Sequence, residues 1–127
     1  MEKRLLPWHK VAGPNEVVFE PDLSYGSFAA DLHAVVTGEA HKDYCDPERF
    51  FERTYPTEGM IHLLSDIASR LAGKGGRAVI QLRTPFGGGK THSLIALYHF
   101  FTSPRSRRTE LAEEVCERAG LRPEEIP

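Results

Sequence analysis

The spacing of apolar side chains along the chain predicts helices separated by short loops. The clearest pattern covers residues 58–72, where the apolar positions recur at helical spacing and form one stripe. These positions are Met60, Leu64, Ile67 and Leu71. Thr57 stands before the segment as a suitable N-cap, and Gly73 follows it as a stop signal.

Two helices are predicted before this segment from their capping residues. Ser27 is a suitable N-cap for a helix over residues 28–37, which Gly38 would end. Asp46 followed by Pro47 is a stronger start signal, because proline suits the first helical position. The short helix that it opens carries Phe50 and Phe51.

Two more helices are predicted in the C-terminal part of the chain. The first covers about residues 90–101 and is stopped by Ser103 and Pro104. The second begins after Thr109, which can cap it, and ends at Gly120.

Two segments predict strands instead. Residues 78–83 begin with three successive apolar side chains, a pattern typical of a strand buried on both faces in a parallel sheet. Residues 16–20 predict a second, shorter strand. A glycine-rich loop over residues 84–89 joins the longer strand to the helix at 90–101. This order predicts an α/β fold, a partial P-loop NTPase in which helices precede the first core strand.

The loop and the start of the following helix contain the residues that could bind a nucleotide. Their sequence, T-P-F-G-G-G-K-T-H at residues 84–92, fits a phosphate-binding loop, although Thr84 stands where the usual pattern has its first glycine. Glycines let successive N–H groups turn toward phosphate oxygens, lysine reaches the β- and γ-phosphates, and a threonine hydroxyl can ligate Mg²⁺. The predicted site for ATP and Mg²⁺ therefore comprises Gly87, Gly88, Gly89, Lys90, Thr91 and His92, with the Thr91 hydroxyl as the metal ligand. His92 either senses the γ-phosphate or packs against the loop, and we expect packing.

The charge distribution supports an anionic ligand more than the net charge of −2 does. Residues 73–108 contain seven lysine or arginine residues and no acidic residue. Such a segment favours an anion, although it could also be a chance gap between acidic helices. Arg105, Arg107 and Arg108 at its end could contact a nucleic-acid backbone, but we expect a solvated loop.

Residues 84–99 resemble the Walker A region of a large AAA+-like ATPase family of bacteria and archaea, catalogued mainly as a domain of unknown function. Residues 50–59, and residues 6–8 with 28–32, also resemble that family. The resemblance implies ATP binding and hydrolysis coupled to nucleic acid, because members are often encoded beside DNA methyltransferases and helicases in anti-phage loci. It places Tyr55 near the adenine, where the ring could stack on the base; the alternative is that Tyr55 lies in the core with the two phenylalanines.

Hydrolysis needs a second carboxylate near the metal, and the sequence does not supply a recognisable one. No apolar run that ends in two acidic residues follows Leu82. We therefore expect residues 1–56 to be a lead-in and residues 57–127 to be the start of an ATPase core that stops before its Walker B strand. An ATPase is expected for the longer family protein, and this chain alone is expected to be inactive.

Two other function classes stay open. The chain could bind a nucleotide, a polyanion or a partner protein without turnover, or, as the last choice, it could be a small P-loop kinase. Two distant cysteines, no signal peptide and no apolar run of roughly 20 residues predict a cytoplasmic protein without membrane contact. The expected partners are ATP or ADP, with nucleic acid and a second copy as further candidates.

Overall fold

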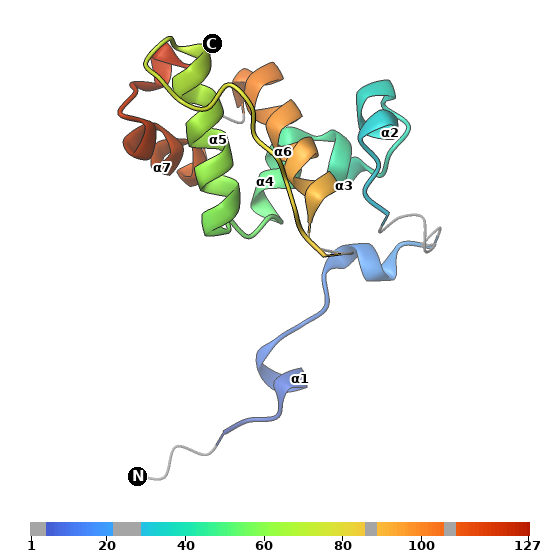
Figure 1. Ribbon diagram of the computed structural model, residues 1–127. Coiled ribbons are helices and arrows are strands. Elements are labelled where there is room, and N and C mark those ends of the chain that lie inside the picture. The colour runs from blue at the N-terminus through green and yellow to red at the C-terminus, as the bar shows by residue number, and fades with distance from the viewer. Residues whose placement is uncertain (1–4, 22–28, 86–88, 106–108) are drawn as a thin grey trace.

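Every regular element in the part of the chain that the structure describes is helical. The computed structural model describes residues 5–21, 29–85, 89–105 and 109–127. Its α-helices are α1 (Trp8–Val11), α2 (Leu32–Thr37), α3 (Lys42–Cys45), α4 (Pro47–Glu52), α5 (Glu58–Leu71), α6 (Lys90–Thr102) and α7 (Glu110–Ala119), and its 3₁₀ helices include η1 (Glu16–Phe19) and η4 (Pro123–Glu125). Helices α2 to α7 gather in one body, and the N-terminal residues extend from it as an arm (Figure 1). Among the described helices, none has both the length and the apolar character of a membrane span.

One side of the body is built by the packing of α5 against α7. Leu64, Ala68 and Val115 are completely buried between these helices and their neighbours. At the rim, the Arg118 guanidinium lies 2.8 Å from a carboxylate oxygen of Glu58. The apolar stripe predicted for the segment before Gly73 is therefore real, but it fades toward the C-terminal end of α5, where Leu71 is exposed.

The other side of the body is built around α6, which packs against α2 and α4. Phe50, Ile95 and Phe100 fill this part of the core and are almost fully buried. His99 is also buried, and its Nε2 atom lies 2.6 Å from the Tyr44 carbonyl oxygen, which satisfies the imidazole inside the protein. Contacts of His99 with Phe50 and with the Tyr44 carbonyl thus hold the middle of α6 against α3 and α4.

The capping residues set most helix boundaries as the sequence predicts. The side-chain oxygens of Asp46, Thr57 and Thr109 accept hydrogen bonds from backbone N–H groups in the first turns of α4, α5 and α7. Gly120 ends α7 in the left-handed conformation that glycine adopts without strain, and Ser103 ends α6. These predictions are confirmed.

The predicted start of α2 is wrong. The helix begins at Leu32 because the Asp31 carboxylate caps it, accepting hydrogen bonds from two N–H groups of the first turn. Residues 29–31 are not helical, and Ser27 lies outside the described residues. Gly38 ends the helix in the left-handed conformation, as predicted.

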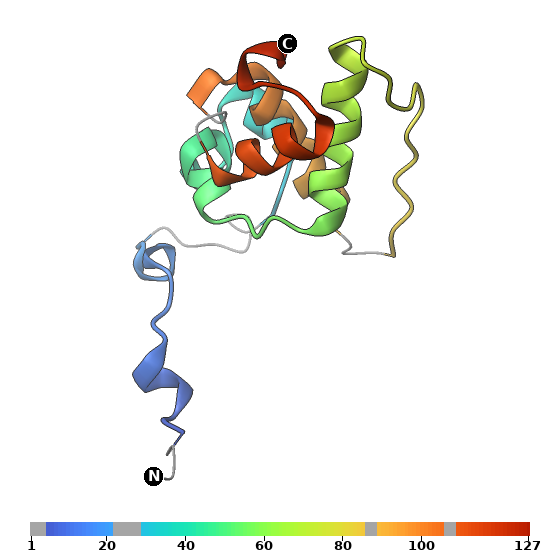
Figure 2. The same cartoon turned by 90° about the vertical axis from the view of Figure 1, so that its left-hand side faces the viewer.

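The predicted α/β fold is wrong for the part of the chain that the structure describes. Residues 78–83 run along the outside of the helical body without pairing into a sheet (Figures 1 and 2), and Val79 is 84% exposed. A strand needs a neighbour for its backbone N–H and C=O groups, and the described residues supply none here. The second predicted strand, residues 16–20, is also wrong: it forms η1, because Asn15 Oδ1 accepts a hydrogen bond from the Val17 N–H.

Candidate functional site

The start of α6 is shaped to leave backbone donors available. Gly89 is its N-cap residue, with a φ of 80° and a ψ of 20°, and within residues 5–21, 29–85, 89–105 and 109–127 no side chain caps the helix. The first backbone hydrogen bond of the helix runs from the Ser93 N–H to the Gly89 carbonyl, over 2.9 Å. The N–H groups of Lys90, Thr91 and His92 precede that bond, so they point out of the helix end with its positive dipole.

Two polar side chains stand at this helix end as predicted. Lys90 is exposed, and its Nζ atom lies 3.4 Å from the Thr84 carbonyl oxygen, so the side chain folds back toward the loop. Thr91 is exposed in the same turn. Gly87 and Gly88, the other glycines of the predicted site, lie outside the described residues.

His92 turns away from the helix end and packs into the body. Its ring centroid lies 4.6 Å from that of Phe50, and its Nε2 atom lies 2.9 Å from the Thr54 hydroxyl. Burial lowers the pKa of the His92 imidazole below its usual value of 6.5, because the charged ring would lose hydration. His92 therefore packs, but against Phe50 and Thr54 rather than the predicted glycine-rich loop, whose residues 86–88 lie outside the described part of the chain. The ring is held in a site that favours its neutral form.

His92 also forms part of the wall of a pocket of about 250 Å³. The other residues around this pocket come from the N-terminal segment and from α3, α4 and the residues just after α4: Asn15, Val17, Asp43, Tyr44, Phe50, Arg53 and Thr54. Tyr44 and Phe50 give it apolar walls. Arg53 closes its edge by an ion pair to Asp43 and by a 2.9 Å contact to the Glu16 carboxylate, which ties η1 to the body.

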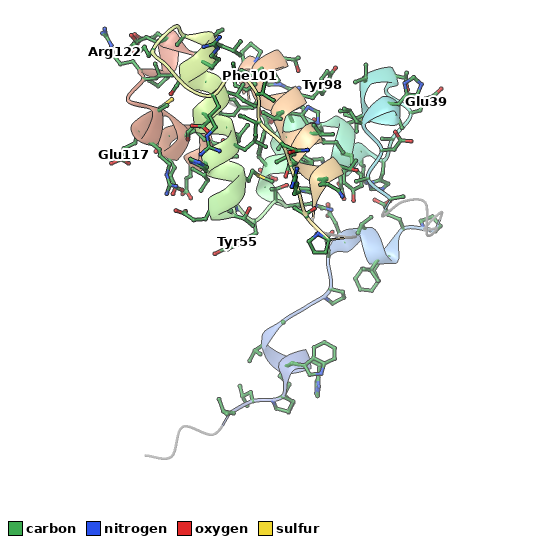
Figure 3. All side chains as sticks on the ribbon, in the orientation of Figure 1. Glu39, Tyr55, Tyr98, Phe101, Glu117 and Arg122 are labelled. Atoms are coloured by element: carbon green, nitrogen blue, oxygen red, sulfur yellow. The ribbon has the colours of Figure 1, made fainter. Side chains whose placement is uncertain are left out.

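The structure separates the aromatic residues that the sequence grouped together. Phe50 and Phe51 are buried, which confirms their core role. Tyr55 is 82% exposed and points away from the body (Figure 3), so it is not part of the core. Arg105 is exposed, with a guanidinium nitrogen 3.9 Å from a Glu48 carboxylate oxygen.

Sequence reasoning missed the pocket beside His92. Tyr44 and Thr54 carry no motif, and they meet His92 only because α3 and α4 pack across the start of α6. The sequence offered one hint of this pocket: Thr54 lies between Phe50 and Tyr55, in a segment noted for its aromatic residues. Arg107 and Arg108, from the predicted basic cluster, lie outside the described residues.

A family model described as the DUF499 N-terminal domain matches residues 15–124, which include η1, the pocket and the start of α6. No curated protein and no solved structure matches the chain.

Proposed function

We propose that this chain, which belongs to the family of the DUF499 N-terminal domain, binds ATP and Mg²⁺ at the start of α6. One observation carries the proposal. A glycine-rich loop leads into α6 through a left-handed Gly89, no side chain of the described residues caps the helix, and Lys90 folds back toward the same loop. The same helix end thus offers backbone donors, the positive end of a helix dipole and a lysine, which are the components of anion-binding sites.

The phosphates would lie over the first turn of α6. The N–H groups of Gly87, Gly88 and Gly89 would turn toward the phosphates, and those of Thr91 and His92 would face the β- and α-phosphates. Lys90 would neutralise the β- and γ-phosphates. The Thr91 hydroxyl would be the one protein ligand of Mg²⁺, an ion that keeps most of its water ligands.

The base would occupy the pocket beside His92. That residue belongs both to the first turn of α6 and to the pocket wall, so a ring-sized space lies next to the phosphate position. A volume of about 250 Å³ lies just below the usual range for ligand pockets, which suits one ring system better than a whole nucleotide. Tyr55, exposed next to Thr54, is the alternative stacking residue.

Calorimetric titration with Mg²⁺–ATP tests the proposal. We expect Lys90→Ala to weaken binding at least about tenfold, since it removes the charge that contacts two phosphates. Lys74→Ala is the matched control: it removes one positive charge from the same basic stretch, and its ammonium pairs with Glu125 rather than lying at α6. Equal affinities for the two variants would contradict the proposal.

The resemblance of the T-P-F-G-G-G-K-T-H segment extends the proposal to an AAA+-like ATPase whose work involves nucleic acid in phage defence. A second candidate is a nucleotide- or polyanion-binding module without turnover. It is favoured because no apolar run ending in two acidic residues follows Leu82. Phosphate release by the purified chain, measured against Lys90→Ala, tests the module directly: turnover above that variant supports the enzyme and rules the module out. Binding without turnover fits both candidates, because this chain alone is expected to be inactive.

A further inference from the structure

The N-terminal arm, residues 5–13, carries large apolar side chains that nothing in the described structure covers. Leu5 is 94% exposed, Trp8 is 76% exposed and Val11 is 67% exposed. Both views show the arm extending away from the helical body (Figures 1 and 2). Exposing this much contiguous apolar surface is unfavourable in water, so the arm has the character of a docking segment.

A groove on the body offers the matching surface. It has a volume of about 460 Å³ and lies between the segment after α4 and the start of α7. Its lining is Phe51, Glu52, Thr54, Pro56, Thr109, Glu110 and Leu111. Phe51, Pro56 and Leu111 give it an apolar part. Glu52 and Glu110 are exposed in its wall, and within the described residues no ion pair engages either carboxylate.

We propose that the arm of one copy of this chain docks in this groove of a second copy. Trp8 is the anchor, because an indole ring brings more apolar surface into a groove than any other side chain of the arm. Lys10 lies two residues further on and supplies the charge that complements Glu52 and Glu110. The chain therefore carries both surfaces of the interface, the arm and the groove. Each has an apolar part, and their charges are opposite.

The base of the arm favours docking on another copy over docking on its own body. Arg53 binds Glu16 of η1, which fixes the point where the arm leaves the body. From that point the arm runs away from α4 and α7 in both views. Two copies that exchange arms bury both grooves and both tryptophans in a closed, two-fold dimer.

The single tryptophan makes the contact measurable. Trp8 is the only tryptophan of the sequence, so intrinsic fluorescence reports on the arm alone. We expect concentrated protein to sediment as a dimer with blue-shifted, quencher-protected Trp8 emission. Both signals should return to those of an exposed monomer over the same dilution range.

Variants identify the interface. Trp8→Ala should raise the dimer dissociation constant about 30-fold, the size expected for a buried aromatic anchor. Glu52→Lys should raise it about fivefold or more, and adding Lys10→Glu should recover part of that loss, because the pair at position 52 returns with its charges exchanged while Glu110 then faces a like charge. Phe19→Ala, which removes an exposed aromatic ring outside both the arm and the groove, should leave it unchanged.

Three results would overturn the proposal. The first is a monomer with an exposed Trp8 at every concentration. The second is a Trp8 that stays protected on dilution, which would place the arm in the groove of its own chain. The third is a dimer that Trp8→Ala does not weaken, which would assign the interface elsewhere. None of these outcomes depends on nucleotide binding, so the ATP proposal stands or fails separately.

Discussion

The Thr54 hydroxyl joins the end of α4 to the start of α6 through His92. It lies 2.9 Å from His92 Nε2 and donates its own hydrogen to the Phe50 carbonyl over 2.6 Å. A hydroxyl has one hydrogen to give, so the contact to the imidazole needs a donor on the ring. His92 is therefore the Nε2–H tautomer when neutral, and its first-turn position is coupled to the segment that follows α4.

Removing this hydroxyl should loosen the start of α6. Thr54→Val keeps the shape of the side chain but leaves the half-buried Nε2–H of His92 without its acceptor. We expect a loss of about 1–2 kcal/mol in the free energy of unfolding, the usual cost of an unpaired buried donor. Urea denaturation measures it.

Thr102→Val is the matched control for this substitution. The Thr102 hydroxyl also donates to a carbonyl four residues earlier, that of Tyr98, over 2.6 Å, but its side chain is exposed. Water replaces that bond, so we expect a change below about 0.5 kcal/mol. Similar losses of unfolding free energy in both variants would show that the hydrogen bond to His92 does not stabilise the protein.

The buried imidazole of His92 should make stability depend on pH. Its pKa is lowered in the folded state by burial, so the unfolded chain takes up a proton first as the pH falls. The stabilising contribution is present above the unfolded pKa near 6.5 and is lost as the pH falls from there through the folded pKa. His92→Gln, which cannot titrate and keeps a donor near Thr54, should lack this part of the profile. Urea unfolding between pH 8 and pH 5 tests it, and parallel profiles for both proteins would contradict it.

Local signals predicted the helices because the forces that end a helix act between neighbouring residues. Asp46, Thr57 and Thr109 cap helices through N–H groups two or three positions away, so a sequence pattern identifies them. For the same reason the start of α6 was placed correctly at Lys90. The predicted start of α2 was wrong because the Asp31 carboxylate, four residues after Ser27, caps the helix instead.

The wrong strand prediction and the missed pocket both concern structure that depends on residues far apart in the sequence. Three apolar residues after Arg77 predict a buried strand only if neighbouring strands exist, and the described residues provide no sheet for them. The pocket around His92 required α3 and α4 to pack across α6, which no short motif records. The glycine-rich segment predicted the start of α6 at Lys90, but not that Tyr44 and Phe50 would pack beside His92.

Glu20, which directly follows η1, forms ion pairs with His41 and Lys42 at the start of α3. These contacts should make its carboxyl unusually acidic. Hydrogen bonds from Lys42 and then from His41 lower the pKa of Glu20 from 4.5 to about 2. This contribution to stability is present above about pH 4.5 and is lost as the pH falls toward 2. Carboxyl-carbon NMR should show Glu20 titrating near the bottom of that window, and Lys42→Ala should move its pKa back toward 4.5. A normal Glu20 pKa in the unsubstituted protein would exclude these ion pairs.

Two glycines near the ends of α5 should respond to alanine in opposite directions. Gly59 lies in the first turn of α5, and an added Cβ meets nothing within 4 Å. We expect Gly59→Ala to stabilise the protein by about 0.5 kcal/mol, because alanine loses less backbone entropy in a helix.

Gly76 should show the opposite effect. Its φ is 89°, and an added Cβ would stand 2.5 Å from the Asp66 carbonyl oxygen and 3.0 Å from the Arg70 nitrogen. Those are backbone atoms of α5, so they cannot swing aside, and the left-handed conformation costs a further 1–2 kcal/mol or so for alanine. We expect Gly76→Ala to destabilise by about 2 kcal/mol or more in urea denaturation. Because residues 77–85 follow directly, a neutral result would mean that the extended segment does not hold Gly76 against α5.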